Sequence, residues 1–140
     1  MIGIIDTSVA LKWYVEESDS VLARPLLQLD LVAPDVILVE LANALWKKVR
    51  KGQIESSQAN EALSHLAGSV KLVPSPALVD EALNLAVEML HPVYDCLFVA
   101  LAREVRAPLI TADERLFRRL QAFGLGELVV MLSQWRERSD

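Results

Sequence analysis

Four acidic residues lie at the borders of apolar segments: Asp6, Glu40, Asp95 and Asp113. Asp6 ends a short isoleucine-rich run, and Asp113 comes shortly after another short apolar run. Glu40 and Asp95 lie in longer apolar stretches. A carboxylate is costly to bury unless it is paired, hydrogen-bonded or bound to a cation. Carboxylate oxygens are preferred ligands of hard divalent cations, so these four acids suggest a metal site.

Short apolar segments alternate with longer helical ones along the chain. Strands are expected near residues 2–6, 31–33, 71–73 and 108–111, with an edge strand at 128–131. Helices are expected near 9–15, 18–29, 34–52, 56–66, 75–90, 93–105 and 113–123. Gly68 is expected to close the fourth helix, and Ser75 to cap the fifth with Pro76 at its first position. Alternating strands and helices predict a three-layer α/β/α fold around a mostly parallel sheet of four to five strands.

This architecture would bring the acids together. Ligands of open α/β sheets bind beyond the carboxyl ends of the strands, where Asp6 and Asp113 are expected. Glu40 and Asp95 lie early in their helices, and their side chains can lean over the same edge. Helix capping is an open alternative for two of the acids. Asp6 can cap the helix at Val9, and the segment 111–114 matches a capping box with Thr111 as the cap and Glu114 as its partner.

Basic residues flank the acids, although the net charge is −5. At about 100° per residue, Glu40, Asn43, Lys47 and Lys51 fall on one helical stripe. A carboxylate followed by an amide and two ammonium groups suits a metal-bound phosphate whose chain continues along the helix. An ordinary solvent-facing stripe is the alternative. By the same spacing, Arg106 lies in line with Asp95, three turns away.

The composition limits the class of protein. The 140 residues are expected to form one domain, 1–140, and 53% of them are hydrophobic, which predicts a dense core or an apolar surface covered by a partner. The longest apolar run, 96–102, is too short for a membrane span. The start of the chain does not resemble a signal peptide, and there is a single cysteine, so no membrane association and a cytoplasmic location are expected.

Other reactive residue types carry weaker signals. Cys96 lies in a buried-looking helix and is interpreted as a small hydrophobic residue. His65 and His91 have no metal-ligand spacing with each other or with Cys96, which argues against zinc. The sequence contains no glycine-rich phosphate-binding loop, which argues against a nucleotide-driven or NAD-dependent enzyme.

Four segments in order resemble the PIN-domain ribonucleases and, among them, the VapC-type toxins of bacterial and archaeal toxin–antitoxin pairs. The resemblance covers nearly the whole chain. It rests on the segments 4–13 (IIDTSVALKW), 40–45 (ELANAL), 94–102 (YDCLFVALA) and 111–113 (TAD). It implies that Asp6, Glu40, Asp95 and Asp113 are the catalytic acids and metal ligands, with Asp6 and Asp95 as the direct ligands. Thr7, Ser8, Asn43 and Thr111 would support them.

The same resemblance implies a function. An all-oxygen pocket suits Mg²⁺, with Mn²⁺ as a substitute, and would serve an endoribonuclease in which a water molecule attacks the phosphodiester. The implied substrate is single-stranded or looped RNA, cut to leave a 3′-hydroxyl. Contacts to this RNA are expected from Lys47, Lys51, Arg106 and Arg115. The implied partners are a second copy, as a homodimer, and a small antitoxin that blocks the site.

Two rival functions remain open. A PIN fold can bind RNA or a protein partner without cutting, although all four acids are present here. A receiver-like or phosphatase α/β domain also holds Mg²⁺ in an acidic pocket. That rival would need a second acid beside Asp6, and the segment Asp6-Thr7-Ser8 supplies none.

Overall fold

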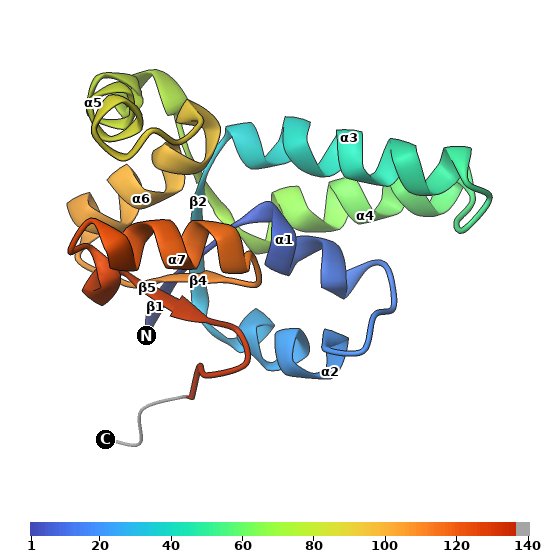
Figure 1. The fold of residues 1–140 in the computed structure, drawn as a ribbon. Coiled ribbons are helices and arrows are strands. Elements are labelled where there is room, and N and C mark those ends of the chain that lie inside the picture. The colour runs from blue at the N-terminus through green and yellow to red at the C-terminus, as the bar shows by residue number, and fades with distance from the viewer. Residues whose placement is uncertain (137–140) are drawn as a thin grey trace.

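A computed structural model describes residues 1–136 of the chain (Figure 1). The strands are β1 (Ile2–Ile5), β2 (Asp30–Pro34), β3 (Lys71–Val73), β4 (Leu109–Thr111) and β5 (Val129–Met131). The helices are α1 (Thr7–Ala10), α2 (Ser20–Ala23), α3 (Val36–Arg50), α4 (Ser56–Ser69), α5 (Val79–Met89), α6 (Val93–Val105) and α7 (Glu114–Ala122). Short 3-10 turns lie at η1 (Leu11–Trp13), η2 (Arg24–Gln28), η3 (Ser75–Ala77) and η4 (Gly126–Leu128).

The five strands form one sheet in the order β3-β2-β1-β4-β5, and every neighbouring pair is parallel. The central strand is β1, in which Ile4 pairs with Val32 of β2 and with Leu109 of β4. The parallel α/β sheet expected from the sequence is therefore confirmed. The order also differs from the 2-1-3-4-5 arrangement of receiver domains, which removes the receiver-like rival.

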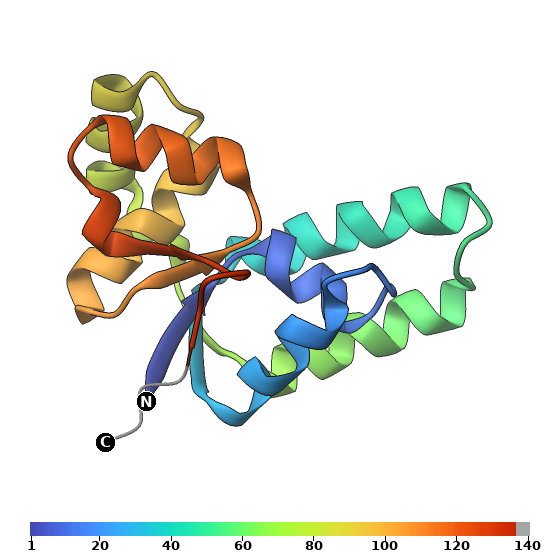
Figure 2. The ribbon, with the colours of Figure 1, turned by 60° about the horizontal axis from the view of Figure 1, so that its bottom comes forward.

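The helices form two groups on the sheet. The chain moves from β1 to β3 in one direction and then crosses over to β4 and β5 in the other. Because crossovers between parallel strands are right-handed, this reversal sends α1 to α4 to one face and α5 to α7 to the other. Figures 1 and 2 show the two groups on different sides of the strands, with α3 and α4 forming a projecting hairpin.

Helix α6 is the centre of the hydrophobic core. It packs on β1, β2 and β4, and α5 packs against its outer side. All residues from Cys96 to Ala102 are buried, including Phe98, which is 1% exposed. A helix that is apolar all round is stable only when it is enclosed in this way. The core therefore accounts for part of the high apolar content and fixes the start of α6, where Asp95 lies.

Several predicted helix boundaries were wrong. Ser75 does not cap a helix, because its backbone N–H and its hydroxyl both donate to Asp35 Oδ1, at 3.0 and 2.5 Å, and α5 begins only at Val79. Gly68 lies inside α4 and does not end it. The second predicted helix is divided at Arg24, where Pro25 enters a 3-10 turn.

None of the helices in residues 1–136 is both long and apolar enough to cross a membrane by itself; α5 and α6 would meet that test only as a pair bent by 116°.

Candidate active site

Asp6 lies at the point where the strand order reverses. It directly follows β1, which is flanked by β2 on one side and β4 on the other, and such a switch point is where ligands of open α/β sheets bind. The residue is 5% exposed. Its Oδ1 accepts hydrogen bonds from the Ser8 hydroxyl at 2.5 Å and from the Val9 backbone N–H at 3.3 Å, and its Oδ2 accepts one from the Thr111 hydroxyl.

Two hydroxyl groups tie the ends of β1 and β4 together around this carboxylate. Ser8 Oγ accepts from the backbone N–H of Ala112 at 3.0 Å, and Thr111 Oγ1 accepts from that of Asp113 at 3.0 Å. Each hydroxyl can therefore donate its own proton to Asp6. Even with these donors, burial raises the pKa of Asp6 to about 6. The site thus keeps an acid that is costly to ionise.

Glu40 reaches the same edge from the first half of α3. It is half-buried, and its Oε1 accepts a hydrogen bond of 2.8 Å from Thr7, the first residue of α1. Burial is the main cause that raises the pKa of Glu40, and the negative charge of Asp95 raises it further. The same Asp95 charge also raises the pKa of Asp6. The structure therefore brings three of the four predicted acids into one electrostatic neighbourhood.

Asp95 is held by a histidine that was not among the predicted site residues. His91 Nε2 lies 2.6 Å from Asp95 Oδ2, and the His91 side chain is 3% exposed against 32% for Asp95. The other ring nitrogen, Nδ1, is buried and has no hydrogen-bond partner among the described residues. The i, i+4 spacing of the two residues across the start of α6 is a sequence signal for this contact. A search for histidines spaced as metal ligands does not find this contact between His91 and Asp95.

Asp113 plays a more local part. It caps α7, since its Oδ1 accepts from the backbone N–H groups of Arg115 at 2.9 Å and Leu116 at 3.2 Å. The capping box predicted with Thr111 as the cap is wrong, because Thr111 is the last residue of β4. Capping at Asp6 is confirmed. Both acids therefore have a structural role at a helix N-terminus, and such a role leaves oxygen lone pairs free for a ligand.

The donor set suits a hard divalent cation in its chemistry. The candidate ligands are carboxylates, and Asp95 raises the pKa of both Asp6 and Glu40, so a cation among them would relieve their repulsion. Over residues 1–136, however, no three acidic, histidine or cysteine side chains form a ready-made metal group. Each carboxylate instead bonds a different protein neighbour. Binding an ion would require some of these side chains to turn towards it.

The remaining predicted residues fall in different places. Asn43, Lys47 and Lys51 are exposed along α3 or just after it, beyond Glu40. Arg115 is exposed next to Asp113 at the start of α7. Arg106 is not brought to the site: it lines a cavity with Met1 and Ile2, at the opposite end of β1.

Cys96, next to Asp95, is buried, and burial raises the pKa of its thiol to about 11. A thiol that stays protonated is a poor nucleophile, which agrees with the interpretation of Cys96 as a core residue.

Comparison with known proteins points to one family. The PIN domain profile matches residues 3–122. The ribonuclease VapC3 of Pyrobaculum aerophilum is 31% identical over 124 residues, which are 85% of this chain and 95% of that protein. The exonuclease VapC9 of the same organism is 32% identical over 97 residues, 69% of this chain and 72% of that protein.

Solved structures show the same fold. PAE2754 from Pyrobaculum aerophilum superposes with a TM-score of 0.71 at 24% identity, covering 95% of this chain and 93% of its own. VapBC-1 from nontypeable Haemophilus influenzae gives a TM-score of 0.63 at 19% identity, covering 96% of this chain and 100% of the matched chain. The profile match and the 31% identity to VapC3 show the family. The chain is therefore a member of the PIN domain family and, within it, of the VapC type.

Proposed function

We propose that this protein is a VapC-type toxin that acts as a Mg²⁺-dependent endoribonuclease, with Mn²⁺ as a substitute ion. The observation that carries the proposal is the group of Asp6, Glu40 and Asp95 at the switch point of the sheet, where burial and mutual repulsion raise the pKa of Asp6 and Glu40. Relatives named ribonuclease and exonuclease support nuclease chemistry. Carboxylates whose pKa values are perturbed by burial and by neighbouring charges are typical of catalytic sites.

The chain's own residues would divide the work. Asp6 and Asp95 would be the direct ligands of the ion, and Glu40 and Asp113 would complete the acidic group around it. When bound, the ion would lower the pKa of an attacking water and neutralise charge on the phosphodiester. Ser8 and Thr111 hold Asp6 through their hydroxyls, Thr7 holds Glu40, and His91 holds Asp95. These contacts keep the carboxylates at the switch point of the sheet before an ion or RNA binds.

Circular RNA separates internal cleavage from trimming of ends. An endonuclease linearises a circle of single-stranded RNA, whereas an exonuclease leaves it intact. We expect linearisation with Mg²⁺ or Mn²⁺, none in EDTA, and products that carry a 3′-hydroxyl and are therefore extended by poly(A) polymerase. If the protein cleaved linear RNA but left circular RNA intact, it would act like the relative named exonuclease.

A matched pair of variants tests the acids. Asp95→Asn removes one anionic oxygen at a 32%-exposed side chain and leaves the buried part of α6 unchanged. We expect cleavage to fall at least a hundredfold while the far-UV circular dichroism spectrum stays the same. Glu61→Gln removes the same charge at an exposed position in the middle of α4 and should cleave like the parent. Equal cleavage by Asp95→Asn and the parent would overturn the assignment.

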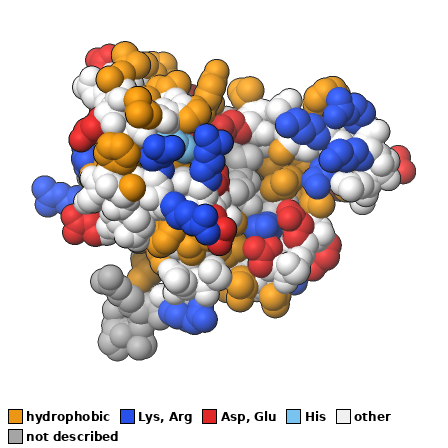
Figure 3. Space-filling model, in the orientation of Figure 1, with side chains coloured by type: hydrophobic (Ala, Val, Ile, Leu, Met, Phe, Trp, Pro, Cys, Tyr) orange, Lys and Arg blue, Asp and Glu red, His pale blue; other side chains and the backbone are white. Residues whose placement is uncertain are grey.

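We also propose that the protein works with an antitoxin and as a homodimer. Its surface carries exposed apolar side chains that a partner could cover, on α3 (Val39 and Trp46) and along α5 and its end (Val79, Leu83, Val87 and Leu90). Figure 3 shows hydrophobic side chains gathered over α5. A structural neighbour is a VapBC assembly. Sedimentation of the purified chain should give a dimer at micromolar concentration, and a monomer would contradict this part of the proposal.

A non-catalytic binding module is the second candidate. The lack of a ready-made metal group among residues 1–136 favours it, since each acid already has a protein partner. Titration with Mn²⁺, followed by the paramagnetic resonance signal of the free ion, separates the candidates. A nuclease should remove Mn²⁺ from solution and lose this ability with Asp6→Asn, whereas a binding module would leave the signal unchanged.

A further inference from the structure

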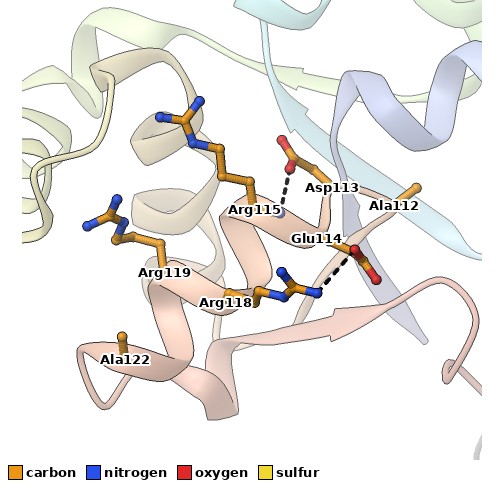
Figure 4. A pocket seen from close by; sticks show the side chains of 7 residues that line it. All are labelled: Ala112, Asp113, Glu114, Arg115, Arg118, Arg119 and Ala122. Atoms are coloured by element: carbon orange, nitrogen blue, oxygen red, sulfur yellow. Dashed lines mark hydrogen bonds and ion pairs between the residues drawn. The ribbon is translucent and has the colours of Figure 1, made fainter.

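Helix α7 has an arginine-lined groove that opens beside Asp113. A cavity of about 830 Å³ lies along the helix, and its charged lining consists of Asp113, Glu114, Arg115, Arg118 and Arg119. In Figure 4, Arg115 and Arg119 extend to one side of α7, whereas Arg118 turns towards Glu114. The groove therefore presents two guanidinium groups next to the candidate active site.

These two arginines have no evident structural task. Arg118 pairs with Glu114 at 3.4 Å, but within residues 1–136 neither Arg115 nor Arg119 lies within ion-pair distance of a carboxylate. The helix is attached to the core by its other face, through the fully buried Leu116 and Leu120. Surface arginines without partners contribute little to stability, so these two are free to serve a ligand.

Their spacing and chemistry suit a phosphate chain. Residues 115 and 119 are one helical turn apart, about 6 Å along the axis, so both side chains can reach one strand. Guanidinium groups bind phosphate oxygens through two parallel hydrogen bonds. We propose that the groove on α7 binds the backbone phosphates of the RNA strand on one side of the scissile bond, with Arg115 and Arg119 as the phosphate ligands.

The charge layout favours nucleic acid over an acidic protein segment. Figure 3 shows Lys and Arg side chains over α7 beside acidic ones, and a second basic group at the far end of α3. A strand that leaves the groove past Asp113 would pass the acids and continue towards Lys47 and Lys51. This inference rests on the proposed function, because it assigns the substrate contacts of the same site.

Salt dependence tests the groove directly. A short fluorescein-labelled oligouridylate is titrated in EDTA, where no cleavage occurs, over a series of salt concentrations. For single strands, each phosphate contact contributes about 0.7 to the slope of log K against log salt. The double variant Arg115→Gln/Arg119→Gln should therefore reduce the slope by about 1.4 and weaken binding about 25-fold at 0.1 M salt.

The control variant loses the same amount of positive charge at positions outside the groove. Arg24→Gln/Arg103→Gln removes two arginines that form exposed ion pairs with Glu16 and Glu81, and it should keep the parent slope. A slope unchanged in Arg115→Gln/Arg119→Gln, or a parent that shows no salt-dependent binding, overturns the proposal. The proposal is also overturned if the groove binds labelled polyglutamate instead of oligouridylate and this binding depends on the two arginines. A parent that binds RNA through the groove but never cuts it would overturn the nuclease function alone.

Discussion

The ionised form of Asp6 should destabilise the folded state. Its pKa is raised from 3.8 to about 6 because burial disfavours the ionised form. Between these two values the folded state binds more protons than the unfolded state, so stability falls as pH rises from about 4 to 6. A difference of about 2 pKa units corresponds to about 3 kcal/mol. At pH 7 in EDTA, the isosteric change Asp6→Asn should therefore raise the free energy of unfolding by about 3 kcal/mol.

Urea unfolding in EDTA at several pH values measures this difference. The advantage of Asp6→Asn should shrink below pH 6 and be nearly absent at pH 4, where the native Asp6 is protonated. In Asp6→Asn, Oδ1 can keep its hydrogen bonds from the Ser8 hydroxyl and the Val9 N–H. Thr111 Oγ1 can accept from the new amide and donate its own proton to Ser8 Oγ, which lies 3.4 Å away. Glu61→Gln, which changes an exposed acid, should differ from the parent by less than about 0.5 kcal/mol at every pH.

Mn²⁺ should reverse the order of the two proteins. An ion that binds only the folded state adds about 4.1 kcal/mol at one thousand times its dissociation constant, which exceeds the advantage of about 3 kcal/mol, and Asp6→Asn should lose most of this gain. The reasoning would be refuted if Asp6→Asn were no more stable than the parent at pH 7 in EDTA, or if its advantage were the same at pH 4.

Three further changes test other parts of the structure. His91→Leu removes the donor to Asp95 and should lower RNA cleavage about 10- to 100-fold while the circular dichroism spectrum stays native. His91→Gln keeps a donor near the position of Nε2 and should recover part of the activity. Equal cleavage rates for the two variants would argue against a role of His91 in positioning Asp95. Leu90→Gly should raise the free energy of unfolding, measured in urea, by about 1 kcal/mol. Leu90 ends α5 in the left-handed conformation, with φ 53°, which glycine adopts more easily, and its side chain is 78% exposed. A lower stability of the variant would contradict this account of the Leu90 backbone. Phe98→Ala, at the centre of α6, should cost about 3 to 5 kcal/mol in the same assay, and a loss below about 1 kcal/mol would mean that α6 is not the core helix.

Patterns among neighbouring residues predict much of this fold. The isoleucine-rich run before Asp6 and the apolar stretch after Asp95 predict β1 and α6, because burial and period are read from adjacent residues. The acids at the ends of apolar segments indicate the correct edge of the sheet for Asp6, Glu40 and Asp95. The same local reasoning fails at Ser75, since its hydroxyl bonds Asp35, which is 40 residues earlier in the chain.

By itself, then, the sequence determined the class of fold, the position of its strands and the residue types available for catalysis. Only the tertiary structure decided how those residues are held. Thr111 donates to Asp6 across 105 positions of sequence, and Arg106 lies at the opposite end of β1 from the acids although its helical spacing lines it up with Asp95. The physical reason is that helix and strand formation depend on nearby residues, whereas a hydrogen bond between distant segments exists only after the sheet has set their register.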